Sequence, residues 1–332
     1  MKIDGFLLAM LCAVVLAFVA PHLGTPDGPL HMGLVTTLGI AFVFFLHGAN
    51  LSPEALKAGA TNWRIHVAVQ ATTFIVFPLI GFTIFFGLRP VLSEEVRLGV
   101  FFLCALSSTI SSSVAMTSLA RGNVPAAVFD ASLSGIMGMV ITPMLIAMVR
   151  AVSGQSFPIL PAIADVAMTL LLPFAAGQIA RPLIARWLAA RKPIINRLDR
   201  GVIILIVYSA FCESTASGLW WSYSPWVIAQ IAVIAGALLA LILWLTTRLS
   251  RAWGFSLADE VTTVFCGSKK SLANGAPIAK ILFAGDPAMG MIMLPIILYH
   301  QLQLIVCSML ARRYAARAEV AATDAKETVA VS

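Results

Sequence analysis

The sequence predicts an all-α polytopic membrane protein with ten transmembrane helices, arranged as two inverted five-helix repeats. Hydrophobic residues make up 60% of the 332 residues and charged residues only 11%, whereas soluble domains typically carry about a quarter charged residues. Apolar stretches of about 20 residues, enough to cross a hydrocarbon core about 30 Å thick, recur along nearly the whole chain. The lipid bilayer is therefore the expected solvent for most of this protein.

Ten apolar segments are candidate spans, separated by polar residues and by Gly or Pro. The first follows Lys2 without a small-residue cleavage site behind it, which favours a span over a signal peptide. In chain order the candidates cover residues 5–22, 31–50, 63–88, 96–121, 124–150, 161–179, 194–213, 225–249, 257–284 and 287–309.

The basic residues predict the orientation of these spans. With the N-terminus inside, sixteen of the 22 Lys and Arg fall on the cytoplasmic side, and three (Arg89, Arg97 and Arg150) fall on the other. This asymmetry predicts an inner-membrane protein with both termini in the cytoplasm. Because the net charge of +7 is spread over loops, it indicates topology rather than nucleic-acid binding.

The fourth and ninth segments each carry a polar interruption near their middle, at residues 107–113 and 267–277. Backbone that leaves the helical ladder at membrane depth needs partners from the protein or from a water-filled cavity. We therefore expect two discontinuous helices, 4 and 9, whose breaks line a cavity.

An internal repeat relates the two interruptions. An offset of 162 residues places Cys104 on Cys266 and the serine run on the lysine-containing run. The chain then divides into five-span halves at residues 1–155 and 156–315, with a disordered cytoplasmic tail at 316–332. Because five is odd, the second half enters the membrane inverted, an arrangement that places binding sites between discontinuous helices at midplane.

Lys269 and Lys270 are the most informative pair, because a lysine at membrane midplane costs several kcal/mol unless it finds water, a carboxylate or carbonyl dipoles. We interpret them as a built-in cation that attracts an anion, and we assign that role first to Lys269. Desolvation favours neutral lysine, so proton coupling is a further expectation. The alternative is that both lysines lie in a cytoplasmic loop.

Further candidates for binding the solute or an ion surround these lysines. Hydroxyls and amides at a half-helix N-terminus suit a carboxylate ligand, although small residues also serve helix packing. A buried Asp130 would neutralise one of the lysines or relay a proton, unless it is an interfacial acid. The remaining candidates are Ser111, Ser112, Ser113, Gly267, Ser268 and Asn274.

Two motifs carry a family resemblance. Residues 116–123, MTSLARGN, and residues 265–273, FCGSKKSLA, resemble the bile acid:sodium symporter family, in its divergent bacterial branch grouped with the human member seven. The resemblance extends over residues 5–313. It implies a panel domain of spans 1, 2, 6 and 7, a core domain of spans 3–5 and 8–10, crossing helices 4 and 9, and transport of organic anions with sodium.

The sodium ligands that the resemblance implies are largely absent. The ligating serine falls on Ser113, but the other positions fall on Val114, Ala127, Ala131, Phe265 and Lys269. Sodium prefers oxygen ligands that include a carboxylate, and an ammonium repels it. Transport without sodium is therefore expected as well.

These observations predict a secondary active transporter that moves a small organic anion by alternating access. A non-transporting membrane regulator and a sodium-coupled bile-acid-like symporter are the alternatives. An enzyme is disfavoured because no HExxH motif or paired aspartates occur on facing spans. We expect no cofactor and no bound metal, since the five cysteines have no metal-ligand spacing. The expected partners are the anion, sodium or a proton, and the bilayer, but no nucleic acid.

Overall fold

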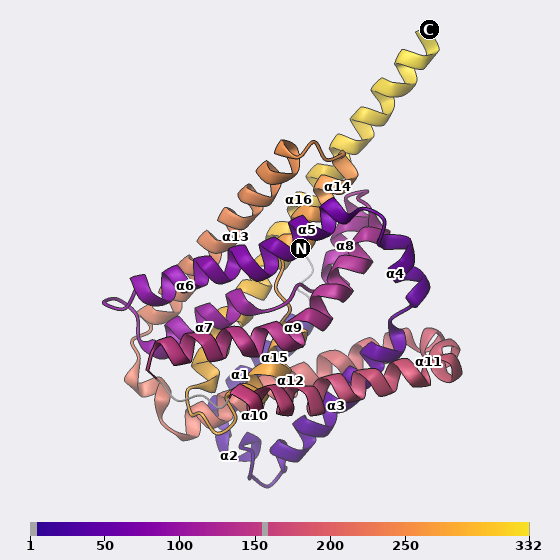
Figure 1. Cartoon of the computed structure of the whole chain (residues 1–332). Coiled ribbons are helices and arrows are strands. Elements are labelled where there is room, and N and C mark those ends of the chain that lie inside the picture. The colour runs from indigo at the N-terminus through magenta and orange to yellow at the C-terminus, as the bar shows by residue number, and fades with distance from the viewer. Residues whose placement is uncertain (1–4, 155–158, 332) are drawn as a thin grey trace.

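The computed structural model describes residues 5–154 and 159–331, and these residues form helices without any strand (Figure 1). The expected boundary between the two halves, at residues 155 and 156, lies outside the described residues. The elements are α1 (Gly5–Val19), α2 (Pro21–Gly24), α3 (Met32–Asn50), α4 (Pro53–Gly59), α5 (Trp63–Ala71), the π-helix η1 (Thr72–Val76), α6 (Phe77–Gly87), α7 (Glu94–Ala105), α8 (Ser111–Leu119), α9 (Val124–Val152), α10 (Ile159–Val166), the π-helix η2 (Ala167–Leu171), α11 (Leu172–Ala190), α12 (Lys192–Ala216), the 3₁₀-helix η3 (Leu219–Ser222), α13 (Trp226–Ala252), α14 (Leu257–Ser268), α15 (Leu272–Leu282) and α16 (Met289–Val331).

Six helical stretches of the described chain are long and apolar enough to cross a membrane, which makes this a polytopic membrane protein. They cover Met32–Asn50, Trp63–Gly87, Val124–Val152, Leu160–Ala190, Trp226–Ala252 and Met289–Arg317. The other four predicted spans correspond to the 15-residue α1, to α12 with its charged first turns, and to the two helices that are interrupted.

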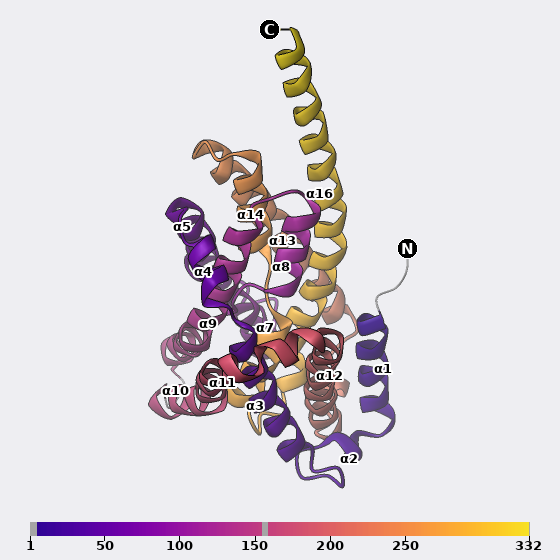
Figure 2. The ribbon, with the colours of Figure 1, turned by 90° about the vertical axis from the view of Figure 1, so that its right-hand side faces the viewer.

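The helices form two groups by their contacts. In the α3/α12 group, α3 packs on α11 and α12, and α12 also packs on α1. In the α9/α14 group, α7 packs on α6, α9 and α16, and α13 packs on α14 and α16. This group also contains α5, α8 and α15, which pack on α9, and η1, which joins α5 to α6. Figures 1 and 2 show the α3/α12 group below the α9/α14 group in both views. Contacts of α12 with α15 and α16 join the two groups.

Both expected interruptions are present. The predicted fourth span is divided into α7 and α8 by residues 106–110, and the predicted ninth into α14 and α15 by residues 269–271. Serine and glycine compete poorly for helix interiors, which explains why the ladder ends at these runs. Each break leaves backbone groups of the helix ends without intrahelical partners.

Two π-helices were not expected. Pro78 follows η1 and Pro173 follows η2, each at the start of the next α-helix. Proline has no N–H and clashes with the carbonyl of the residue four positions earlier, so the helix widens locally instead of breaking. In η1 this frees backbone carbonyls inside the α9/α14 group.

The C-terminal segment, for which the sequence predicts a cytoplasmic tail at 316–332, continues α16 to Val331. Figures 1 and 2 show this last part projecting away from the bundle. The segment is rich in Ala, which has the highest intrinsic helix propensity and extends the helix that precedes it.

Candidate functional site

The two helix breaks meet in the middle of the α9/α14 group. Ser271 N donates to Ser107 O at 2.9 Å, and Ser108 Oγ donates to Cys266 O at 2.6 Å. Asn274 Nδ2 donates to Ser107 Oγ at 3.0 Å. The polar run of each break therefore satisfies backbone groups that the other break has freed, as burial requires.

Lys270 is fully buried, and its ammonium is held by backbone carbonyls. Its Nζ donates to Leu106 O at 2.6 Å, to Cys104 O at 2.8 Å and to Thr73 O at 3.0 Å. Two of these carbonyls end α7 and the third belongs to η1. The Phe77 ring lies 4.0 Å from Nζ, a cation–π contact. Three carbonyls and a ring face thus surround the charge much as a protein surrounds a bound cation.

Lys269 is also fully buried, but it has fewer polar contacts. Its Nζ donates to Ser112 O at 2.8 Å and lies 5.8 Å from the centre of the Phe265 ring. Lys269 therefore joins the break in the ninth span to the start of α8. We expected Lys269 to serve as the fixed cation, whereas the coordination of Lys270 is the more complete one.

The extended backbone at the second break is held by α16. Lys270 N donates to Gln303 Oε1 at 2.8 Å, and Gln303 Nε2 donates to Lys270 O at 2.9 Å. Tyr299 OH donates to Ser268 O at 2.6 Å. Our sequence analysis missed both residues, although an amide in the middle of an apolar span is a signal that could have found Gln303.

The serines at the start of α8 occupy three different environments. Ser113 is buried and its Oγ donates to Phe265 O at 3.3 Å. Ser112 Oγ lies 2.9 Å from Thr109 Oγ1, and Ser111 is exposed.

Two further candidates lie at the end of α14. Ser268 Oγ donates within its own helix to Val264 O, at 2.6 Å. Gly267 is buried beside α13, where an added Cβ would lie 3.3 Å from Thr246.

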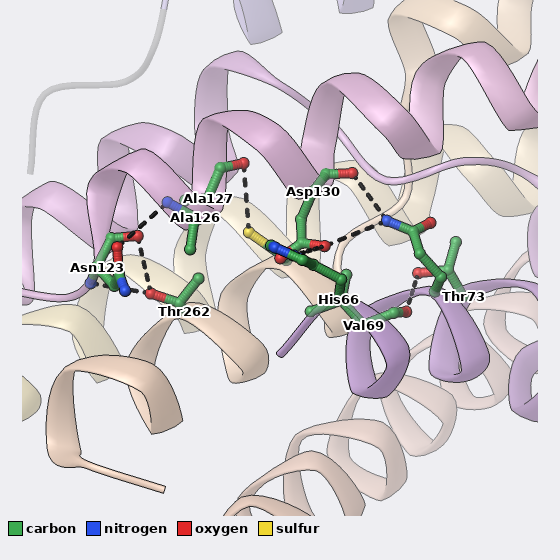
Figure 3. Close-up of polar contacts among 10 residues, drawn as sticks. His66, Val69, Thr73, Asn123, Ala126, Ala127, Asp130 and Thr262 are labelled. Carbon is green, nitrogen blue, oxygen red and sulfur yellow. Dashed lines mark hydrogen bonds and ion pairs between the residues drawn. The ribbon is translucent and has the colours of Figure 1, made fainter. Parts of the chain in front are cut away.

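Asp130 does not pair with either lysine. Its carboxylate is fully buried, and Oδ1 lies 3.0 Å from His66 Nδ1 and 3.4 Å from Gln70 Nε2 (Figure 3). Among the described residues, hydrogen-bonding partners of the lysine ammoniums are carbonyl oxygens instead. The direct contacts of the Asp130 carboxylate are thus with α5 and not with a lysine, because α9 directs Asp130 toward α5.

Asn123, in the MTSLARGN run, connects the loop between α8 and α9 to α14 by hydrogen bonds. Its side chain accepts from Ala126 N at 3.2 Å and so caps α9. Its Nδ2 donates to Asp259 Oδ1 at 3.0 Å. Its backbone N donates to Thr262 Oγ1 at 3.0 Å (Figure 3). Arg121 adopts a positive φ of 58° where α8 ends, which lets the chain turn sharply.

A small cavity of about 30 Å³ lies between the two helix groups. His47, Leu51 and Phe174 line it from the α3/α12 group. The other lining residues come from the break in the fourth span, from α9 and from α15: Ile110, Ser132, Gly135, Ile136, Met139 and Asn274. Asn274 also bonds to Ser107, so one side chain contacts both the cavity and the crossing of the broken helices. It has room for only about two water molecules.

The described residues contain no group of three or more His, Cys, Asp or Glu side chains that could hold a metal ion. Ala127, Ala131 and Phe265, at positions where the resemblance implies sodium ligands, are buried hydrophobic residues here. The polar centre of the molecule is accordingly built from lysine ammoniums, backbone carbonyls, hydroxyls and amides.

A polytopic helical bundle with two broken helices crossing at its centre has the architecture of secondary transporters. The profile of the SBF-like CPA transporter family matches residues 4–316, and the chain belongs to that family.

Several related proteins match over nearly their full length. The chain is 46% identical to "Uncharacterized protein PA2026" of Pseudomonas aeruginosa, over 98% of this chain and 96% of that protein. It is 40% identical to "Putative symporter YfeH" of Escherichia coli, over 96% and 94%. It is 30% identical to "Sodium/bile acid cotransporter 7" of Danio rerio, over 92% of each chain.

Proposed function

We propose that this protein is a secondary active transporter that moves a small organic anion by alternating access. The observation that carries the proposal is the crossing of the two broken helices around Lys269 and Lys270. Both ammoniums are buried there, and their hydrogen-bonding partners in the described chain are neutral carbonyls. An excess positive charge in a low-dielectric centre favours an anionic ligand.

In this proposal a lysine replaces the coupling cation that the names of the vertebrate relatives imply. The three carbonyls around Lys270 Nζ, at 2.6 to 3.0 Å, supply the kind of oxygen cage that a monovalent cation would occupy. A tethered ammonium is always present, so sodium is not needed to hold the crossing together. The sodium-coupled symporter remains the alternative, favoured by the name "Sodium/bile acid cotransporter 7" of relatives.

Alternating access requires two bodies that move against each other. We assign the α3/α12 group to the panel domain and the α9/α14 group to the core domain. The cavity between them, at about 30 Å³, is far smaller than an organic anion, so we assign the structure to a closed form of the proposed cycle. Movement of the panel against the core would open it toward either side of the membrane.

The remaining features of the proposal concern the membrane. We propose ten spans in two inverted halves, because the breaks at 106–110 and 269–271 follow the 162-residue offset seen in the sequence. We place the protein in the bacterial inner membrane with both termini in the cytoplasm, in accord with the distribution of Lys and Arg.

The test is uptake into proteoliposomes that contain the purified protein, with radiolabelled taurocholate and benzoate as large and small anionic probes. We expect uptake of an anion that persists when choline replaces sodium. Asn274→Leu should abolish that uptake without unfolding the protein, because it removes the amide shared by the cavity and the crossing. Uptake that requires sodium would favour the alternative, and a folded protein without flux of either probe would count against transport.

A further inference from the structure

A buried polar cluster joins α5 to α9, apart from the lysines. His66 is 9% exposed and Asp130 is 0% exposed. His66 Nδ1 lies 3.0 Å from Asp130 Oδ1, and Gln70 Nε2 donates to Asp130 O at 3.0 Å (Figure 3). The Phe129 ring lies 4.3 Å from the His66 ring and covers it. An imidazole and a carboxylate are thus held together in a site from which most water is excluded.

Each of these three side chains has one buried polar atom without a hydrogen-bond partner in the described chain. The atoms are His66 Nε2, Asp130 Oδ2 and Gln70 Oε1. Leaving a buried polar atom unpaired costs roughly 1–3 kcal/mol. Three such atoms in one cluster indicate that the cluster binds something beyond what the closed conformation supplies.

A proton fits this cluster better than a metal ion. Sodium takes several oxygen ligands, and the α9 residues on either side of Asp130 that face inward, Ala127 and Ala131, have no side-chain oxygen. A proton needs a single acceptor, and either His66 Nε2 or Asp130 Oδ2 provides one.

We propose that the His66–Asp130 pair binds and releases one proton and that this proton is the coupling ion of the transport cycle. The role of this proton as the coupling ion rests on the proposed function, whereas proton binding at the pair does not. An ionised Asp130 can only accept, so Nδ1 of neutral His66 then carries a hydrogen and the pair has a charge of −1. One proton added at Nε2 or at Oδ2 makes the pair neutral, and no other bond changes.

Other charged groups near the pair have partners of their own. Asp259 accepts from Asn62 and Asn123, and Glu260 pairs with Arg251. The titratable group that faces Asp130 from α14 is the Cys266 thiol, whose Sγ lies 3.9 Å from Ala127 O. The other titratable groups on α5, on α9 and on the elements packed against them are Glu54 and Lys57 on α4, Arg64 on α5, Glu94, Glu95, Arg97 and Cys104 on α7, Arg150 on α9, Asp165 on α10, Arg248 on α13 and Lys280 on α15.

The helix that carries His66 also reaches the crossing of the broken helices. His66, Gln70 and Thr73 are spaced i, i+4 and i+7, so they share one face of α5 and η1. Thr73 O is one of the three carbonyls that hold Lys270. The helix whose charge changes when the pair binds a proton therefore directly contacts Lys270, at the proposed binding centre for the anion.

The balance of charges determines whether the proton and the anion move together or in opposite directions. The two ammoniums and the deprotonated pair give a net charge of +1, and a bound monoanion lowers it to zero. The field of that anion favours proton uptake at the pair, and by reciprocity the bound proton favours the anion. The expected cycle is therefore proton–anion symport.

Proton binding is measured without any solute by solid-supported membrane electrophysiology on the full-length protein in liposomes. A jump from about pH 8 to about pH 6, within the range in which histidine serves as a pH switch in proteins, should give a transient displacement current in the wild type. His66→Gln and Asp130→Asn should reduce it to the level of protein-free liposomes. The matched control is Asp199→Asn, because Asp199 pairs with His47 at 3.4 Å in the α3/α12 group, and it should keep the transient.

Gln70→Met extends the test, since it keeps both titrating groups even if the other variants fail to fold. It removes a hydrogen bond from the carboxylate, so the half-maximal transient should move to higher pH. A wild type without a transient, an Asp130→Asn protein that keeps it, or an unmoved half-point in Gln70→Met would overturn the proton site. If the transient behaves as expected while no anion flux occurs, the site stands and the proposed transport fails.

Discussion

Lys270 shows how a charged side chain can lie in the interior of a membrane protein without a carboxylate partner. The three carbonyls that accept from its ammonium come from the end of α7 and from η1. They are available because a broken helix and a π-helix each leave carbonyls outside the regular ladder. The lysine therefore stabilises the two irregularities that make room for it.

This arrangement predicts the consequence of removing the ammonium. Lys270→Ala leaves three buried carbonyls unpaired, and we expect a loss of at least about 3 kcal/mol in the free energy of unfolding. The melting temperature in detergent should fall by several degrees, and added methylammonium should restore part of the loss by entering the carbonyl cage. Lys57→Ala, at an exposed lysine of α4, is the control and should have no effect. A Lys270→Ala protein as stable as the wild type would contradict the cage.

For single residues, the sequence identified the polar run at 267–277 but not the hydrogen-bond partner of each of its side chains. Lys269 and Lys270 are adjacent and chemically identical, so nothing in the run itself predicts which ammonium is better coordinated. The sequence also could not predict the partners of Asp130, because His66 and Gln70 lie some 60 positions away on another helix.

Among the elements, the tightest helix contact is between α3 and α11 in the α3/α12 group. Gly48 faces the backbone of Phe174, and Gly177 faces the backbone of Phe45, so a Cβ at either glycine would collide with a main-chain carbonyl. Gln178 Nε2 also donates to Gly48 O at 2.7 Å and to Leu51 O at 3.0 Å, which satisfies the end of α3. These contacts fix α3 and α11 as one rigid unit.

Gly177→Leu is therefore expected to separate α3 from α11. A backbone carbonyl cannot move aside as a flexible side chain can, and overpacking of this kind costs about 3 kcal/mol. The melting temperature of the purified protein should fall by several degrees. The same change at Gly236, where no atom lies within 4 Å of the added Cβ, is the matched control and should be tolerated. Equal melting temperatures for the two variants would refute the close contact.

For the elements themselves, the interruptions of the fourth and ninth spans were predictable, because runs of Ser, Gly and Lys in apolar segments are incompatible with an ordinary lipid-facing helix. The π-helices were not predicted, since Pro78 and Pro173 in apolar segments are equally consistent with a kink. The helical end of α16, which continues to Val331, agrees with the Ala-rich composition of its last part.

At the scale of the whole molecule, two helix groups meet at a cavity too small for an organic anion, and residues of both groups line it. His47 approaches from α3, and Asn274 from the crossing. In the proposed cycle, this interface opens and closes, and the charge at the crossing and at the His66–Asp130 pair changes the balance between the two forms.

The proposed topology makes a prediction that needs no solute. Green fluorescent protein fused after Ser332 should fluoresce, and alkaline phosphatase fused there should be inactive, because the C-terminus is expected in the cytoplasm. Alkaline phosphatase inserted after Gly218, in the loop before η3, should be active. The opposite pattern would exclude ten spans with both termini inside.

The sequence by itself determined that the chain is a membrane protein, where most of its helices lie and which two of them are interrupted. These properties depend on local composition and on the cost of exposing polar backbone to lipid. Only the tertiary structure decided that the breaks bond to each other, that Lys270 rather than Lys269 has three carbonyl partners, and that Asp130 faces His66. Such pairings depend on how helices distant in the chain are packed, and no local pattern of residues specifies that.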